Sequence, residues 1–237
     1  MSARSEQSRA PAQTKALPKR SPERHRVQRT KARARYDHED IHAILDAGLI
    51  AHVGFCIDGQ PFVIPMLYAR DGETLLLHGS IASRLVNALG AGVPACISVT
   101  IVDGLVLARS HFHHSVNYRS VVAFGIATLV SDADEKVAAL ARFVDTIIPG
   151  RTDESRPPDR KELAATNVLR FDIQDVSAKV RTGGPKDDPA DADLPHWAGV
   201  VPQRAAYGAP LADASVPTGT GLPHSVQRLL ALAGART

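Results

Sequence analysis

Three Asp-Gly pairs, each set between short apolar segments, constrain the fold of this chain more than any other feature of its sequence. They are Asp58-Gly59, Asp71-Gly72 and Asp103-Gly104. Asp-Gly favours tight two-residue turns, so each pair predicts a hairpin between antiparallel strands. The segments of strand character are Leu49–Ile57, Pro61–Tyr68, Thr74–His78, Ala95–Val102, Leu105–Ser110 and Val121–Val130, and Val168–Val180 returns to strand character later. Six strands with tight turns predict a mainly β fold, a six-stranded antiparallel barrel, because closure removes exposed edges.

Short flanking helices are predicted between and after these strands. Apolar residues at helical spacing, together with capping residues, place helices at 37–47, 82–90, 132–148, 158–166 and 225–233. The most regular is 132–148, with apolar positions at Val137, Leu140, Ala141, Val144 and Ile147.

The charge of the chain is unevenly distributed. Residues 1–35 hold eleven Lys and Arg against two Glu, whereas residues 36–237 hold 17 basic and 23 acidic residues. With so few large apolar residues, the basic segment cannot offset its ordering entropy by burial. The sequence therefore predicts a disordered basic tail at 1–35, a folded domain at 36–182, and an irregular extension at 183–237 with a terminal helix. Without aromatic interleaving or a motif, the tail is interpreted as solvated, and nucleic acid is not the expected partner.

Cysteine content and hydropathy indicate the compartment. Cys56 and Cys96 both fall in apolar runs, which predicts buried free thiols rather than a disulfide framework. No apolar run reaches the roughly 18 residues that a membrane span needs, and no signal-peptide core is seen. We expect a soluble, cytoplasmic protein.

The stretch Leu75–Arg84 is the first candidate site. Three leucines end a strand, His78, Gly79 and Ser80 supply a polar tip, and Ser83 and Arg84 open a helix. A helix N-terminus with a hydroxyl and a guanidinium suits a phosphate group. The alternative interpretation is an ordinary strand–turn–helix with a surface arginine.

Polar residues at two other strands form the second candidate site. Tyr118, Arg119 and Ser120 begin one strand and suit packing, anion binding and hydrogen bonding, although taken alone they are better explained as a satisfied barrel rim. Lys179 and Arg181 alternate at the end of the last strand. His111, His113 and His114 lack a partner at metal-ligand spacing, so no metal site is predicted. Rossmann, Walker and nucleophile-elbow motifs are absent from the sequence, which removes three large enzyme classes.

Together these residues resemble the pyridoxamine-phosphate-oxidase-like flavin-binding split barrels, and more narrowly their nitroimidazole-resistance (nitroreductase-like) branch. The most specific parts are Leu77-His78 followed by Ser83-Arg84, and residues 115–121 followed by Phe124-Gly125. The resemblance runs from about Tyr36 to Gly184. It implies a split barrel that binds FMN as a homodimer, with the cofactor at the subunit interface.

Carried over by position, the resemblance also implies the cofactor contacts. Ile64, Pro65 and Met66 would lie along the isoalloxazine ring, His78, Gly79 and Ser80 beside the ring and ribityl chain, Ser83 and Arg84 at the phosphate, and Tyr118, Arg119, Ser120 and Val121 around the rest, with Lys179 matching a lysine of the last family strand. Leu85 stands where true pyridoxamine phosphate oxidases carry a second cationic phosphate ligand. His78 is the catalytic candidate, because an imidazole can donate a proton near neutral pH.

The resemblance predicts an FMN-dependent oxidoreductase that reduces a small redox-active molecule. Two alternatives stay open at this point. One is a flavin- or haem-binding protein without turnover of its own, for which the histidines at 111–114 make haem conceivable. The other is a reductase that uses a deazaflavin.

Overall fold

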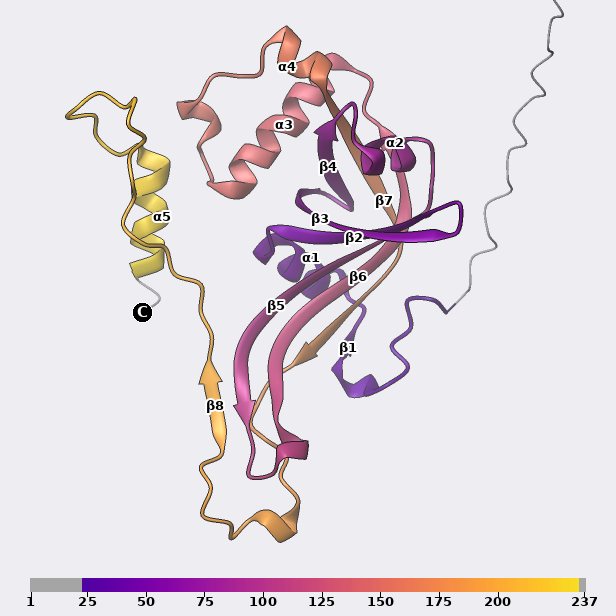
Figure 1. Cartoon of the computed structure of the whole chain (residues 1–237), viewed down its shortest axis with the longest axis vertical. Helices are drawn as coiled ribbons and strands as arrows, with labels where there is room; N and C mark the ends of the chain where they lie inside the picture. The colour runs from indigo at the N-terminus through magenta and orange to yellow at the C-terminus, as the bar shows by residue number, and fades with distance from the viewer. Residues whose placement is uncertain (1–22, 235–237) are drawn as a thin grey trace, which may run out of the picture.

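The computed structural model describes residues 23–234 and consists mainly of antiparallel strands (Figure 1). The strands are β1 (Ala34–Arg35), β2 (Ile50–Ile57), β3 (Gln60–Asp71), β4 (Thr74–Ser80), β5 (Ala95–Leu107), β6 (Ser115–Leu129), β7 (Thr166–Arg181) and β8 (Gly199–Pro202). The helices are α1 (His38–Ala47), α2 (Arg84–Gly90), α3 (Ala133–Ile147), α4 (Arg160–Ala165) and α5 (His224–Gly234). Every predicted helix is present within two residues of its predicted start and end.

Six of the strands close into a ring. Neighbours pair in the order β7-β4-β3-β2-β5-β6, and β6 pairs back onto β7 along twelve residue pairs. All of these pairings are antiparallel. The predicted six-stranded antiparallel split barrel is therefore confirmed. β1 and β8 lie outside the ring, where they pair with β7 and β5.

The Asp-Gly pairs have two different roles. Asp58 and Gly59 both have positive φ, 50° and 80°, and turn β2 into β3 as predicted. Gly72 has φ 58° in the turn from β3 to β4.

Asp103-Gly104 is not a hairpin, so the prediction of two strands around it was wrong. Val102 pairs with Tyr118 and Gly104 with Asn117, which leaves Asp103 as an extra residue within β5. Such a bulge bends a strand without ending it. A Cβ on Gly104 would lie 3.0 Å from the carbonyl oxygen of Val201, so glycine also lets β8 approach closely. The sixth strand of the ring is β7. The six strands predicted for the barrel did not include it, because they counted β5 as two strands.

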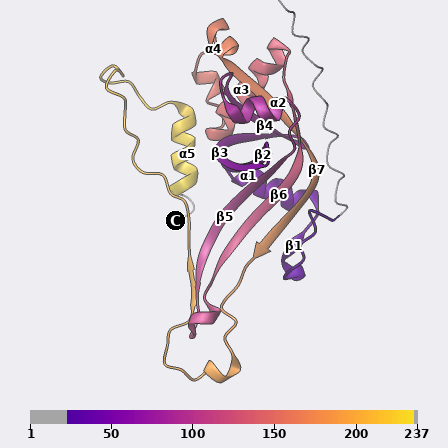
Figure 2. The same ribbon diagram turned by 45° about the vertical axis from the view of Figure 1, so that its right-hand side comes forward.

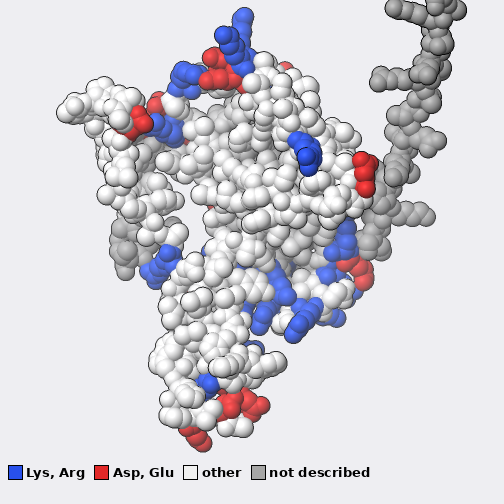
Figure 3. Space-filling model, viewed as in Figure 1, with Lys and Arg blue, Asp and Glu red and all other residues white. Residues whose placement is uncertain are grey.

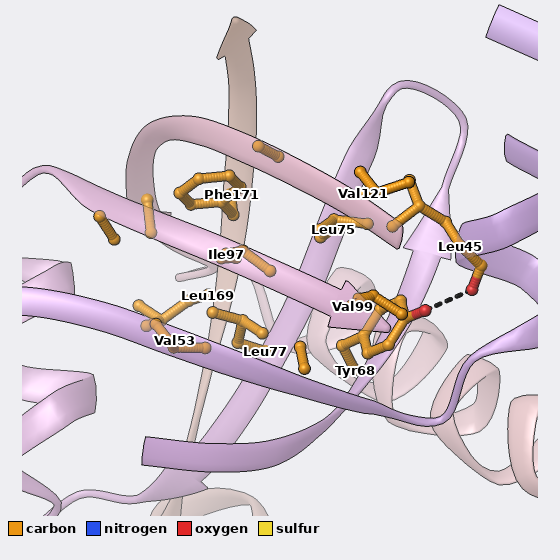
Figure 4. Packing of buried hydrophobic residues seen from close by; sticks show 14 of the residues in the cluster. Leu45, Val53, Tyr68, Leu75, Leu77, Ile97, Val99, Val121, Leu169 and Phe171 are labelled. Carbon is orange, nitrogen blue, oxygen red and sulfur yellow. Dashed lines mark hydrogen bonds between the residues drawn. The ribbon is translucent and has the colours of Figure 1, made fainter. Parts of the chain in front are cut away.

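The interior of the ring is filled by alternating side chains from all six strands (Figure 4). Val53, Leu75, Leu77, Ile97 and Leu169 are each at most 1% exposed. Their burial supplies the main stabilisation, at about 25 cal/mol for each Å² of apolar surface. At one end α1 closes the barrel, and the hydroxyl of Tyr68 donates a hydrogen bond to the carbonyl of Leu45 at this end.

A second, smaller apolar cluster lies outside the ring, between the sheet and α3. Ala139 and Phe143 of α3 pack there against Leu76 and Val168. Leu75 and Leu77 face the barrel interior while Leu76 faces α3, because successive side chains of a strand alternate between faces. His78 lies two residues after Leu76 and therefore on the same face of β4. Its side chain points toward α3 and away from the barrel interior.

Residues 23–35 lie in the segment predicted as a disordered tail, whereas in the structure they contact the body. Arg24 forms an ion pair with Asp175 at 2.6 Å and lies over the ring of Phe124, and β1 adds two residues to the edge of β7. The folded part thus begins before the predicted boundary at residue 36. The rest of that predicted tail, 1–22, lies outside the described residues.

The C-terminal segment runs beside the barrel. β8 extends the long β5–β6 arm, and α5 stands apart from the sheet on the side of α3 (Figure 2). Ser225 of α5 donates a hydrogen bond to Glu154, and Arg228 donates to the carbonyl of Pro149 at 2.9 Å. The predicted irregular extension therefore contains one strand in addition to its expected helix.

Two further expectations concern cysteine and membrane. Cys56 is exposed on the outer face of β2 and Cys96 is partly buried, so the prediction of a buried thiol was wrong for Cys56. None of the helices in residues 23–234 is long and apolar enough to cross a membrane.

Candidate functional site

The junction of β4 and α2 has the strand-to-helix geometry that the sequence predicts. The hydroxyl of Ser83 accepts a hydrogen bond from the amide of Val86 at 3.4 Å and so caps α2. A Cβ on Gly79 would lie 2.9 Å from Val86, which requires a residue without a side chain there. Ser80 is exposed and its hydroxyl accepts from the amide of Ala82.

Arg84 is exposed at this junction, and its guanidinium lies 5.1 Å from the centre of the Phe62 ring. Among the described residues it has no carboxylate partner. A guanidinium that rests on an aromatic ring without a counter-ion keeps its hydrogen-bond donors for an external anion.

The β3 residues Ile64, Pro65 and Met66 alternate between the two faces of the sheet. The side chains of Ile64 and Met66 pack against the main core, whereas Pro65 is exposed on the opposite face. Of these three predicted flavin contacts, the side chain of Pro65 alone faces outward.

His78 lies on the outside of the barrel, against α3. Its ring packs edge-to-face on Phe143 with 4.3 Å between the ring centres. The Nδ1 atom is buried and has no hydrogen-bond partner. Burial lowers the pKa of the His78 imidazole below its ordinary value of 6.5, because the charged form loses hydration there. The ring is therefore neutral at neutral pH.

A cavity of about 650 Å³ opens in front of His78. It lies between the outer face of the sheet, one face of α3, and the segment from residue 152 to α4. The lining residues are Leu67, His78, Val137, Leu140, Ala141, Phe143, Val144, Ile147, Thr152, Ser155, Arg156, Pro157, Pro158, Glu162 and Thr166. Most of this surface is apolar, and apart from His78 its polar residues come from the segment 152–166. This is the shape and composition of a site for a large, mostly apolar ligand.

The helix α3 forms one wall of the cavity because its apolar stripe is only partly covered by protein. An apolar stripe at helical spacing ordinarily packs on a core. Here the buried residues of α3 are Ala139 and Phe143, while all five positions of the predicted stripe line the cavity. This partly uncovered stripe is the feature that sequence reasoning missed, since the pattern alone does not tell a core face from a ligand face.

Arg156 and Glu162 form the charged part of the cavity rim. Two hydrogen bonds join them, at 2.8 and 2.7 Å, and these bonds lower the pKa of Glu162 to about 2. The pair is exposed, so its donors and acceptors can exchange partners with a charged ligand group at the cavity mouth.

The second predicted cluster lies on β6 and β7, close to β1. Ser120 pairs with Lys179 across the two strands, and Tyr118 pairs with Arg181. Val121 is 1% exposed and belongs to the barrel core. Lysine and arginine side chains gather over β1 in this region (Figure 3).

Three cations of this cluster differ in their availability. Arg119 forms a two-point ion pair with Asp103, at 2.9 and 2.8 Å, so its charge is already compensated. Arg181 is buried and donates to Asn117 and to the carbonyl of Gly183. Lys179 is half-buried and has no ion pair among the described residues. Within one chain this cluster and the Arg84 junction stand on different parts of the barrel.

A family model described as pyridoxamine 5'-phosphate oxidase matches residues 37–180. A comparison with curated proteins found no match. Among solved structures, the flavocytochrome Anf3 from Azotobacter vinelandii is 42% identical, with 85% of this chain and 94% of that chain covered and a TM-score of 0.79. The FAD and haem binding protein from Mycobacterium smegmatis is 41% identical, with coverage of 83% and 96% and a TM-score of 0.80.

A third structure shares the fold at greater distance. The putative 5-nitroimidazole antibiotic resistance protein from Bacteroides thetaiotaomicron is 22% identical, covers 62% of this chain and 86% of its own, and has a TM-score of 0.53. The two closer structures match more of this chain than the family model does, so their similarity extends beyond the barrel.

Proposed function

Because the chain belongs to the pyridoxamine 5'-phosphate oxidase family, we propose that it is a flavin- and haem-binding redox protein that passes electrons to a small acceptor molecule. Similarity to two solved structures supports this proposal. Both are 41–42% identical to this chain, and one is a flavocytochrome while the other is an FAD and haem binding protein. Inside the chain, one observation carries it: a neutral histidine with an unsatisfied buried nitrogen faces a large apolar cavity.

The cavity fits a haem in three respects. Its volume, about 650 Å³, lies in the range of cofactor sites, and its walls are the apolar face of α3 and the outer face of the sheet. His78 supplies a neutral imidazole, the form that ligates iron. Arg156 at the rim suits an acidic substituent. We propose that His78 would hold the haem through its imidazole, in place of the role as flavin proton donor that the resemblance implies.

The β4–α2 junction suits the flavin phosphate. Arg84 has no carboxylate partner in the described chain, and the hydroxyls of Ser80 and Ser83 lie within the same short segment. We propose that Arg84 holds a phosphate by charge-assisted hydrogen bonds, and that the exposed Pro65 borders the ring.

We propose FAD rather than FMN as the flavin, because the 41% identical structure is that of an FAD and haem binding protein. FAD carries a second phosphate and an adenosine. Mass measurement of the flavin released on denaturation separates FAD from FMN and from a deazaflavin.

A homodimer completes the proposal. Exposed apolar side chains include Ile50 of β2, Val63 of β3 and Ile81 at the β4–α2 junction, with 49%, 66% and 52% of their surface accessible. Burial of these side chains against a second copy would stabilise a dimer and shield a flavin from water. It would also explain why the Lys179 cluster and the Arg84 junction stand apart in one chain. Light scattering tests this, since a flavin-loaded monomer would exclude a site built from two copies.

The chain's own residues have limited chemical tasks in this proposal. Bound flavin and haem supply the electron transfer. His78 holds one cofactor from the sheet side, the α3 face excludes water from it, and Arg84 anchors the other.

The absorption spectrum of the purified protein is the decisive experiment. We expect flavin bands together with a haem Soret band, each at one equivalent per chain. A protein that carries flavin and gives no Soret band after haem is added would refute the haem assignment. Oxidation of the reduced protein by a nitroaromatic acceptor, followed by stopped flow, tests the narrower nitroreductase-like activity.

A further inference from the structure

A cluster of two histidines and a glutamate lies on the surface, outside the sites described above. His38 and His42 occupy successive turns of α1, and Glu73 lies in the β3–β4 turn. The Nδ1 atom of His38 lies 2.9 Å from Oε2 of Glu73, and Nε2 of His42 lies 3.3 Å from the same oxygen. The three side chains therefore converge on one point from segments more than 30 residues apart.

From this convergence we propose that His38, His42 and Glu73 bind a divalent transition-metal ion, with Zn²⁺ as the best match. Two imidazoles and a carboxylate are ligands for zinc, copper or nickel, whereas magnesium and calcium prefer oxygen ligands alone. Zinc lies about 2.0–2.2 Å from such ligands, so tetrahedral ligand atoms stand roughly 3.3 Å apart. All three ligand atoms here lie within 4.8 Å of one another, which small side-chain rotations bring to that spacing.

The backbone holds both halves of this metal site in place. The carboxylate of Asp37 caps α1, and Ile41, Ile44 and Leu45 of this helix are buried in the barrel core. Histidines four residues apart on a helix point the same way. In the turn, Gly72 adopts φ 58°. Because the helix and the turn are already held in place, little conformational entropy is lost when their side chains bind an ion.

The charges around the metal site permit a cation. Arg70, which interacts electrostatically with Glu73, pairs with Asp46 at 2.6 Å, so its positive charge is compensated. His38 and Glu73 are largely exposed, so the fourth position of a bound ion faces water.

Titration of the metal-stripped full chain with Zn²⁺ in a calorimeter tests the proposal. We expect one tight equivalent in the wild type, its loss in His42→Ala and in Glu73→Gln, and its retention in the matched control His111→Ala at the tip of the β5–β6 arm. Thermal unfolding gives a second measurement, because an ion that binds the folded state alone raises the melting temperature. Zn²⁺ should raise it for the wild type and the control, and not for the two ligand variants.

Two outcomes would overturn the metal site. One is a wild type that takes up no Zn²⁺ at micromolar concentrations, which would leave the cluster as a histidine–carboxylate ion pair. The other is an equivalent of Zn²⁺ that persists unchanged in both ligand variants. Circular dichroism, recorded on the same samples, reports the folding of each variant independently.

Discussion

Replacement of His78 by phenylalanine tests the haem assignment most directly. The imidazole ring packs on Phe143, and its Nδ1 is buried without a partner. Phenylalanine keeps an aromatic ring at this position and removes both nitrogens. If His78 holds the haem, His78→Phe should lose the haem while the barrel remains folded.

The magnitude of the stability change follows from the unsatisfied nitrogen. A buried polar atom without a partner costs about 1–3 kcal/mol. The slightly larger ring has room, because the cavity lies next to it. We expect His78→Phe to stabilise the haem-free protein by about 1 kcal/mol, which raises the melting temperature by roughly 2–4 °C in a chain of this size.

The effect should depend on pH. In the unfolded chain the His78 imidazole takes up a proton below its ordinary pKa of 6.5, while in the folded chain burial lowers that pKa. Between the two pKa values the unfolded state binds more protons, so the wild type loses stability as the pH falls through 6.5. His78→Phe lacks this group and should lose less. The difference in melting temperature between variant and wild type should therefore widen below about pH 6.5.

The assay combines haem titration with thermal unfolding. Haem is added to the haem-free wild type, to His78→Phe and to the exposed control His111→Phe, and the Soret band is recorded. We expect a saturating Soret band in the wild type and control and a shifted, weak one in the variant. An unchanged Soret position and affinity in His78→Phe would show that another residue ligates the iron, and a lower melting temperature of the haem-free variant would contradict the stability argument.

Three further predictions concern other parts of the molecule. Arg84→Ala should weaken flavin binding by about 1.5–3 kcal/mol in a fluorescence titration, and an unchanged affinity would remove Arg84 from the phosphate site. Gly125→Ala should prevent or strongly destabilise folding, because the added Cβ would lie 2.0 Å from the carbonyl oxygen of Asp172; near wild-type thermal unfolding would refute this. Arg24→Ala should cost about 1 kcal/mol in denaturant unfolding through the lost ion pair with Asp175, whereas no change would place the segment outside the cooperative fold.

Local features of the structure could be read from the sequence because they depend on neighbouring residues. The turn at Asp58-Gly59 needs two positive φ angles, and this residue pair tolerates them. Helix starts at Asp37 and Asp132 follow from side chains that accept hydrogen bonds from amides three residues later. The antiparallel barrel then follows from many short strands with tight connections.

Pairings between distant segments could not be read in this way. Asp103-Gly104 has the composition of a hairpin turn, yet β6 and β8 pair on both sides of it and keep β5 continuous. Cys56 sits in an apolar run, but the register of β2 turns its side chain outward. In both cases the local pattern suited two structures, and hydrogen bonding to distant strands decided between them.

The same distinction between local and long-range features applies to the candidate site. The sequence determined that His78, Ser83 and Arg84 stand where a strand meets a helix, because that depends on a few adjacent residues. Only the tertiary structure decided that His78 faces α3 rather than the barrel interior, since the face depends on which leucines fill the core. It also decided that the apolar stripe of α3 borders a cavity, because whether an apolar face is filled by protein or left for a ligand depends on the packing of the whole chain.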